Sequence, residues 1–294
     1  MVSINKKYQY ILGVSFLAIL LSILIINLTR RGIFNKNIGF NIVVVGEREI
    51  SLLLLRPDEE MVSWIELPSD VKVKIYNSSA SYPIASLWSY GLGERNLFEV
   101  VEKSLGQSMG VIVARTIKID KTKAEVEDVL GALLSLRTKT DLSVRDRMLM
   151  RKFLGEIVKS KKVLELSLPN NAVDKVVEPD GREFSVFNTT TSVWTKNKFV
   201  LEPILDENID VSVNNASDVQ GWGLILAHQL ESSGVHVVEI KVDKLEDIHA
   251  DGCFYATEAS FEMTESLLRD QLGCKKISRK NSELSQPRMN VWIK

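Results

Sequence analysis

The hydrophobic pattern of the chain begins with an uninterrupted apolar run at residues 10–28, which contains no charged side chain. A helix of that length, rising about 1.5 Å per residue, crosses the roughly 30 Å hydrocarbon core of a bilayer. The run is longer than the apolar part of a secretory signal, and no small-residue cleavage site precedes its basic flank. The sequence therefore predicts an uncleaved transmembrane signal anchor at residues 10–28, between a tail at 1–9 and a linker at 29–38.

Short apolar runs rich in β-branched residues follow the linker. Residues 41–45 and 50–55 are separated by a polar turn, and residues 61–67 alternate until a proline stops them, so the three runs predict a strand meander. Further patterns predict helices at 96–105, 121–136 and 143–158, a buried strand at 110–114 and another strand at 163–168. This mixture predicts one α/β domain at residues 39–205. Its expected core includes Val43, Val45, Leu53, Leu55, Trp64, Ile112 and Leu133.

A smaller unit is predicted from about Asp206 onward. A capping box at residues 217–220 opens a helix that ends at Gly234, and a second amphipathic helix ends at Gly273. Strands are expected at 209–213, 235–242, 254–256, 275–278 and 289–293. The order is βαββαβ with one extra strand over residues 206–294, which predicts a small sheet with both helices on one face.

The composition of the chain restricts the kinds of partner and of catalytic or metal site that we expect. The chain has 37 basic and 38 acidic residues and no basic block outside the membrane flanks, so a nucleic-acid partner is not expected. All three histidines lie in the last third, so residues 39–205 hold no Ser–His, Cys–His or histidine-ligated metal site of their own. No set of metal ligands at a recognised spacing is present, and we expect no cofactor.

The two cysteines, Cys253 and Cys274, flank the second predicted helix of the small unit. Each begins a strand, and in a βαβ arrangement neighbouring strand ends can approach to disulfide distance. Two alternatives are open: a disulfide in an oxidising exterior, or two buried free thiols that pack as small apolar side chains.

An ordered series of segments behind the predicted anchor carries a family resemblance. The segments are FNIVVVG at residues 40–46, LPSD at 67–70, IASLWSYG at 84–91 and FEVVEKSLG at 98–106. In this order they resemble the opening of the LytR-CpsA-Psr (LCP) family, membrane-anchored envelope proteins of which many transfer a lipid-linked glycopolymer onto the cell wall. The resemblance implies that the tail is cytoplasmic and that the bulk of the chain is extracytoplasmic, an orientation that the flanking charges do not decide.

The small unit resembles the LytR C-terminal domain that often follows in this family. The resemblance rests on IDVSVNNAS at residues 209–217, on Gly221 at the helix start, and on LESSGVHVV at 230–238. Together with the first series, it implies a transmembrane helix, an LCP-like α/β domain and a C-terminal βαββαβ(β) domain.

The resemblance implies a site for a lipid-linked pyrophosphate, which active members hold with arginines, beside a carboxylate that holds a divalent cation. Fork-shaped guanidinium groups suit phosphate oxygens, and Mg²⁺ prefers oxygen ligands. The acidic position of the family's second strand falls on Glu49, while Arg48 stands one place away from the arginine position. A displacement by one residue in a strand turns the side chain to the opposite face.

Other family positions are also altered. The family turn Pro-Arg-Asp stands here as Pro68-Ser69-Asp70, and serine neither forms a bidentate phosphate contact nor neutralises its charge. Arg145 falls near the family's paired arginines on a helix, where Leu149 occupies one expected position. Two alternatives are open. In the first, a residual phosphate or cation site is formed by Arg48, Glu49, Asp70 and Arg145. In the second, these residues belong to charged turns and to a solvated helix face. We assign no catalytic residue.

These departures favour a non-catalytic envelope protein, a pseudoenzyme that binds a wall or lipid-linked glycan or an envelope partner. One alternative is an active phosphotransferase with Mg²⁺ and a rearranged arginine set, which requires two arginines to meet Glu49 or Asp70 at one pocket. The other is a membrane-tethered regulator on the cytoplasmic side, which a protease-accessibility test on intact cells distinguishes from the first two.

Overall fold

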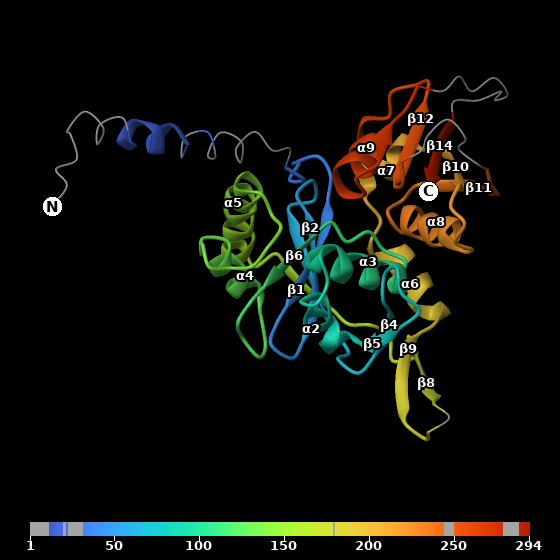
Figure 1. Cartoon of the computed structure of the whole chain (residues 1–294), viewed down its shortest axis with the longest axis horizontal. Helices are drawn as coiled ribbons and strands as arrows, with labels where there is room; N and C mark the ends of the chain where they lie inside the picture. The colour runs from blue at the N-terminus through green and yellow to red at the C-terminus, as the bar shows by residue number, and fades with distance from the viewer. Residues whose placement is uncertain (1–11, 20–21, 23–31, 179, 244–249, 279–287) are drawn as a thin grey trace.

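The structure, a computed structural model, describes residues 12–19, 22, 32–178, 180–243, 250–278 and 288–294 (Figure 1). Within these ranges, no helix combines the length and the apolarity that crossing a membrane requires. The predicted anchor at residues 10–28 lies largely outside the described residues, so it stays a prediction.

The first of two five-stranded sheets has the order β6-β1-β2-β3-β7. β1 (Phe40–Val45), β2 (Ile50–Arg56) and β3 (Met61–Leu67) form an antiparallel meander, which confirms the predicted three strands. β6 (Arg115–Lys118) lies parallel to β1, and β7 (Val163–Leu166) lies parallel to β3.

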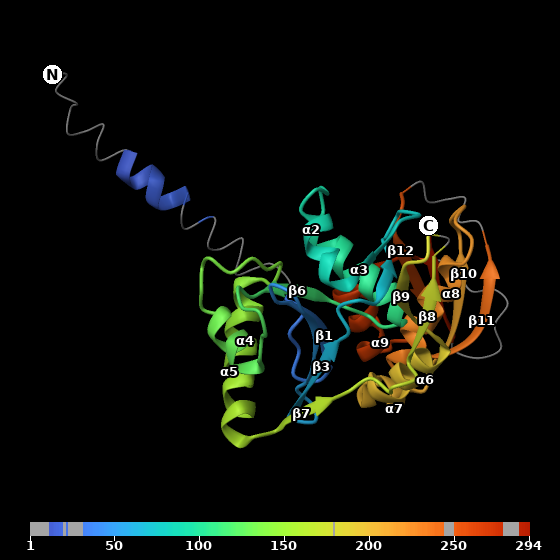
Figure 2. The same ribbon diagram turned by 90° about the horizontal axis from the view of Figure 1, so that it is seen from below.

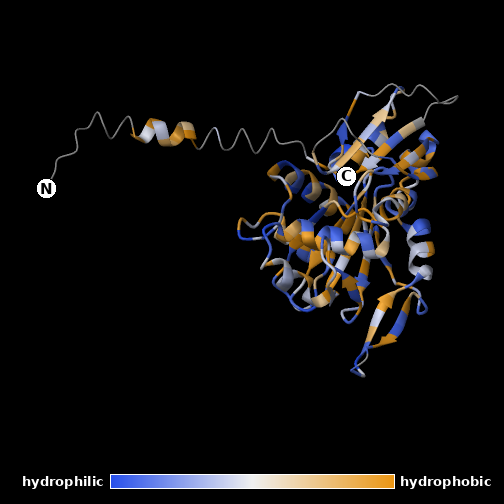
Figure 3. Ribbon diagram, turned by 45° about the vertical axis from the view of Figure 1, so that its right-hand side comes forward, coloured by the Kyte–Doolittle hydropathy of each residue, from blue (hydrophilic) through white to orange (hydrophobic). Residues whose placement is uncertain are grey.

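Helices cover both faces of this sheet, which explains why its central strands β1 and β2 are nearly continuous apolar runs (Figure 3). α2 (Leu87–Gly91) and α3 (Leu97–Met109) pack on one face, and α4 (Val126–Ala132) and α5 (Val144–Ser160) pack on the other. Figure 2 shows the resulting three layers. The expected core is confirmed, since all of its members are buried: Val43, Val45, Leu53, Leu55, Trp64, Ile112 and Leu133.

Short elements connect this body to the rest of the chain. They are β4 (Lys72–Lys74), β5 (Ser81–Pro83), the 3-10 turn η1 (Ile84–Ser86), β8 (Val173–Val177), β9 (Glu183–Phe187), α6 (Thr189–Lys198) and α7 (Glu202–Glu207). β4 pairs with β5, and β8 pairs with β9 in a hairpin that extends away from the body (Figure 1).

The second sheet has the order β11-β10-β14-β12-β13. Its strands are β10 (Asp210–Asn215), β11 (His236–Val242), β12 (Cys253–Thr257), β13 (Lys275–Lys276) and β14 (Arg288–Ile293). α8 (Trp222–Ser232) and α9 (Glu262–Ser266), which continues as the π-helical turn η2 (Leu267–Gln271), pack on one face. The element order and the single helical face agree with the prediction.

The structure corrects the prediction for residues 106–114. α3 continues through Gly106 and ends at Gly110, whose positive φ of 68° suits a left-handed helix cap. The following residues form no strand, although they are buried and apolar. Ile112 lies in the core of the second sheet. Val113 lies in the core between the first sheet and α3, and Ala114 lies in the core between the first sheet and α5. The apolar run at residues 111–114 therefore connects the hydrophobic cores of the two sheets and does not form a strand.

The predicted capping box at residues 217–220 is also wrong. α8 begins after Gly221, whose φ is 90°, and its N-cap makes no side-chain hydrogen bond. The Ser217 hydroxyl donates instead to Asn215 Oδ1 at 2.7 Å, within a polar turn that ends β10. Ser217 therefore stabilises the turn that precedes the helix and does not cap the helix.

Buried contacts join the two units. Gln271 Nε2 donates to the carbonyl oxygen of Gly39 at 2.8 Å, and Gln229 Nε2 donates to that of Val111 at 3.1 Å. Ile38 and Ile112 both lie in the core of the second sheet. Because residues from both sides of the predicted boundary share this core, the division into 39–205 and 206–294 remains a proposal about folding units.

Candidate functional site

A cleft of about 1020 Å³ lies between the two units. One wall comes from the turn after β4, from α3 and from residues 112–115, and the other from residues 216–219, α8, η2 and the ends of β12 and β14. Figure 1 shows α3 and α8 near this boundary. A large concave site lined by apolar and polar groups is the default position for a ligand.

An aromatic pair crosses from one unit to the other at this cleft. The rings of Tyr76 and Trp222 stack with centroids 5.8 Å apart and an interplanar angle of 26°. Tyr76 is held by its backbone N–H, which donates to Ser104 Oγ at 2.9 Å, and Trp222 is the first residue of α8. Lys103 Nζ lies 4.5 Å from the centroid of the Tyr76 ring. Both rings line the cleft and give it an apolar surface.

Two carboxyl groups meet at the edge of the cleft, Glu102 on α3 and Asp141 in the loop between α4 and α5. Thr116 holds both, since its hydroxyl donates to Glu102 Oε1 at 2.9 Å and its backbone N–H donates to Asp141 Oδ1 at 2.9 Å. Two neighbouring carboxyl groups ionise less readily than two separate ones, because their negative charges repel each other.

Of the two groups, Glu102 is the one whose ionisation is more strongly disfavoured. Burial raises the pKa of Glu102 well above its usual range, and the charge of Asp141 adds to the shift. Burial also raises the pKa of Asp141, while the Thr116 N–H and the guanidinium of Arg115 oppose that rise. Arg115 Nε lies 3.4 Å from Asp141 Oδ2, and both Glu102 and Arg115 line the cleft. The site thus presents a carboxyl group whose ionisation is disfavoured, beside a guanidinium that is paired with Asp141.

The remaining charges in the cleft are largely paired. Lys103 lies 2.7 Å from Glu99, and Arg269 Nη2 lies 2.7 Å from Asp270 Oδ2. The amides of Gln107 and Gln229 add polar groups to the lining. A cleft in which Lys103, Arg115 and Arg269 already have carboxylate partners suits a neutral polar ligand better than a polyanion, because a phosphate group needs free donors.

The residues that the sequence singled out lie elsewhere. Arg48 is exposed in the turn after β1, and Glu49 lies near Lys123, which forms an ion pair with Glu66 at 2.8 Å. Asp70 follows β3, where it accepts a hydrogen bond from Ser185 Oγ at 2.9 Å.

Arg145 is exposed on the first turn of α5. In the part of the chain that the structure describes, no hydrogen bond or ion pair joins any two of Arg48, Glu49, Asp70 and Arg145, and none of them lines the cleft. Nor does any group of three or more histidine, cysteine, aspartate or glutamate side chains come together there as a metal site.

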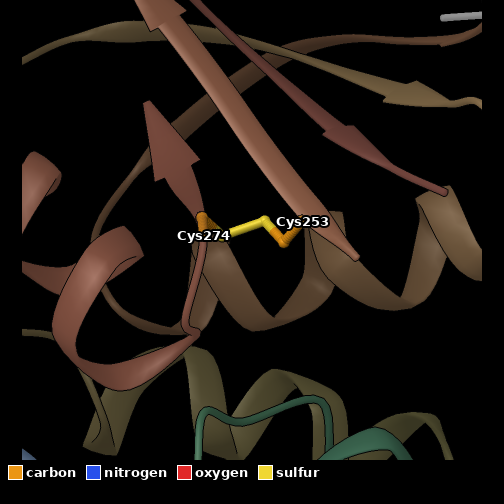
Figure 4. The surroundings of a disulfide bond; sticks show 2 residues. All are labelled: Cys253 and Cys274. Atoms are coloured by element: carbon orange, nitrogen blue, oxygen red, sulfur yellow. A yellow bond between two sulfur atoms is a disulfide. The ribbon is translucent and has the colours of Figure 1, made fainter. Parts of the chain in front are cut away.

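Cys253 and Cys274 form a disulfide in the structure, which is the first of the two alternatives left open by the sequence (Figure 4). Their Cα atoms are 4.4 Å apart, and the bridge joins the first residue of β12 to the residue just before β13. Because Cys253, η2 and Gly273 line the cleft, the disulfide fixes part of its second wall.

No family model and no curated protein matches the chain. Solved structures with a similar chain path include Bacillus subtilis TagT, which is 12% identical with a TM-score of 0.41 and covers 56% of this chain and 91% of TagT. B. subtilis TagV is 9% identical with a TM-score of 0.41, covering 54% of this chain and 94% of TagV. A protein of Enterococcus faecalis described as a transcriptional regulator is 11% identical with a TM-score of 0.41, covering 55% and 89%. These values are too low to assign a family or an activity.

Proposed function

We propose that this chain is a membrane-anchored envelope protein that binds a glycan, free or lipid-linked, in the cleft between its two units, and that it does not transfer that glycan. The observation that carries the proposal is the composition of the cleft, in which the Tyr76–Trp222 pair stands beside paired charges and amides. The anchor predicted at residues 10–28 and the family resemblance of the sequence support the envelope location.

The cleft matches the chemistry of a sugar. A pyranose ring presents C–H groups on its faces and hydroxyl groups around its rim, and aromatic π-systems attract such weakly positive C–H groups. The carboxyl of Glu102 and the amides of Gln107 and Gln229 offer hydrogen-bonding groups to hydroxyl groups. The volume of about 1020 Å³ is at the upper end of the usual range for ligand pockets and accommodates more than one sugar ring.

The same cleft is poorly suited to hold a pyrophosphate. Its two arginines, Arg115 and Arg269, each lie within ion-pair distance of a carboxylate, Asp141 and Asp270. A pyrophosphate would have to displace these carboxylates, and separating a partly buried ion pair is costly. The geometry that the transferase alternative requires, two arginines meeting Glu49 or Asp70 at one pocket, is not found among the described residues.

The proposal is tested by measuring how the full chain in detergent micelles binds soluble wall-glycan fragments and a polyprenyl-linked glycan. We expect Tyr76→Ala and Trp222→Ala each to weaken binding about five- to tenfold, the equivalent of roughly 1–1.4 kcal/mol. The matched control is Tyr82→Ala, because Tyr82 is a half-exposed tyrosine that pairs with Tyr90 outside the cleft.

Equal binding by the wild-type chain and the Trp222→Ala variant would contradict the proposed site, and no binding of any of these glycans would contradict the function. Incubation with Mg²⁺ and a polyprenyl-linked glycan provides a separate measurement. Turnover in that assay would favour the phosphotransferase alternative.

A further inference from the structure

The first described residues after the predicted anchor are fixed on α5. Gly32 lies so close to the carboxylate of Asp146 that a Cβ at this position would collide with it. The backbone N–H of Phe34 donates to Asp146 Oδ1 at 2.9 Å, and the Phe34 ring contacts the rings of Phe40 and Phe153 with centroids 5.9 and 6.0 Å apart. The chain is thus attached to the first turn of α5 from residue 32 onward.

The distance between this attachment and the predicted anchor is short. The apolar run ends at Leu28, so only residues 29–31 separate it from Gly32. A fully extended chain advances at most about 3.6 Å per residue, so the four steps from Leu28 to Gly32 span roughly 14 Å. If residues 10–28 cross the bilayer, the first turn of α5 lies within about 14 Å of the membrane interface.

Exposed apolar side chains gather at this end of α5. Leu134 and Leu136 lie in the loop after α4, with 61% and 95% of their surface exposed, and Met148 on α5 is 64% exposed. Arg147 holds the loop against α5, because its guanidinium donates to the carbonyl oxygens of Ala132, Leu133 and Ser135. Figure 2 shows the loop between α4 and α5 at the end of α5 where the described chain enters.

Basic residues accompany these apolar residues. Arg137, Lys139 and Arg145 are exposed, and no carboxylate in the described ranges lies within ion-pair distance of them. We call this surface the α4–α5 patch, and its members are Leu134, Leu136, Arg137, Lys139, Val144, Arg145 and Met148. Single exposed apolar residues are ordinary on protein surfaces, but apolar residues clustered with unpaired cations are typical of contacts with an anionic membrane surface.

We propose that the α4–α5 patch contacts the lipid bilayer, with Leu134, Leu136 and Met148 at the boundary between headgroups and acyl chains. Arg137, Lys139 and Arg145 then lie among anionic headgroups, where each basic side chain is attracted to the surface. The contact fixes the orientation of the body relative to the membrane, which a flexible tether alone does not do. The proposal rests on the proposed function in one respect, since it takes residues 10–28 as the anchor.

The test uses the full chain reconstituted in vesicles of phosphatidylcholine and phosphatidylglycerol that contain a nitroxide-labelled lipid. A Leu136→Cys variant carries a bimane fluorophore, and the control is Val177→Cys, an exposed apolar position on the β8–β9 hairpin. The native cysteines are joined in a disulfide and do not take the label. We expect the nitroxide lipid to quench bimane at position 136 at least twofold and to leave position 177 unchanged.

The outcomes separate this proposal from the proposed anchor. If the chain floats with the vesicles but bimane at position 136 is not quenched, the anchor stands and the membrane contact of the patch is refuted. Equal quenching at positions 136 and 177 would also refute it. If the chain does not float with the vesicles, both the anchor and the contact that depends on it are refuted.

Discussion

The turn after β1 and the cleft between the units both carry charged residues, but they hold them differently. Arg48 is exposed and Glu49 lies at the edge of a surface ion pair, so both are open to solvent and their charges are screened. Glu102 and Arg115 lie in a cleft whose walls restrict water and whose partners are fixed by hydrogen bonds. Groups held in this way can discriminate between ligands, because leaving one of them unpaired is costly.

The turn and the cleft also depend differently on the rest of the molecule. The turn belongs to a single hairpin of the first sheet, whereas the cleft exists only when the two units are in contact. Changes that disturb this contact should therefore alter the cleft and leave the turn intact, and changes in the turn should have little effect on stability or binding.

The largest effect is expected from removing the disulfide. The Cys253→Ser, Cys274→Ser double variant opens a loop with a sequence separation of 21, for which the chain-entropy model gives roughly 3 kcal/mol. Because the bridge also fixes part of the cleft wall, we expect both a lower melting temperature and weaker glycan binding. Differential scanning calorimetry of the oxidised, reduced and variant chains measures the first effect, and an unchanged melting temperature on reduction would contradict it.

The next effect is expected at Gln271, whose buried amide joins the two units. In Gln271→Ala the carbonyl oxygen of Gly39 loses its partner inside the protein, which costs about 1–3 kcal/mol. Urea unfolding followed by fluorescence measures the change. Exposed Gln220, at which the same substitution removes no described hydrogen bond, is the control, and its alanine variant should unfold at the wild-type midpoint.

A smaller effect of opposite sign is expected from Glu102→Gln. Because folding raises the pKa of Glu102, its contribution to stability is fully present below about pH 4.5 and is lost as the pH rises through the folded pKa. The glutamine amide can donate to Asp141 and its oxygen can accept from Thr116 without binding a proton. We therefore expect the variant to melt about 2–4 °C higher than the wild type at pH 8, equivalent to about 1 kcal/mol, and equally near pH 4.

The control for this pH dependence is Glu127→Gln, which changes an exposed carboxylate on α4. This variant measures the effect of removing an exposed carboxylate at each pH, and the effect of Glu102→Gln is read against it. If Glu102→Gln gave the same difference at pH 4 and pH 8, a raised pKa of Glu102 in the folded protein would be ruled out.

The smallest effects are expected where the family resemblance places a phosphate site. Arg48→Ala and Asp70→Ala change exposed side chains, so stability should remain within about 0.5 kcal/mol and glycan affinity should not change. Titration of both variants with wall-glycan fragments measures their glycan affinity. A tenfold loss of affinity in either one would move the site from the cleft to the turn.

Much of the fold could be predicted because burial on both faces leaves nearly continuous apolar runs in β1 and β2, and because β3 alternates as a strand does. The junction at residues 111–114 could not, because an apolar run that fills three cores has the same composition as a buried strand. The cleft was missed for a related reason. Tyr76 and Trp222, like Glu102 and Asp141, meet only after the units fold together, and nothing in their local sequence distinguishes them from ordinary surface or core residues.

The most direct test of the proposed glycan site is hydrogen–deuterium exchange of the full chain with and without a soluble wall-glycan fragment that binds it. Binding in the cleft should slow amide exchange in residues 76–77, 112–115 and 216–222, and leave residues 46–49 and 69–70 unchanged. Slower exchange confined to the two turns, with no change at the cleft walls, would contradict the account.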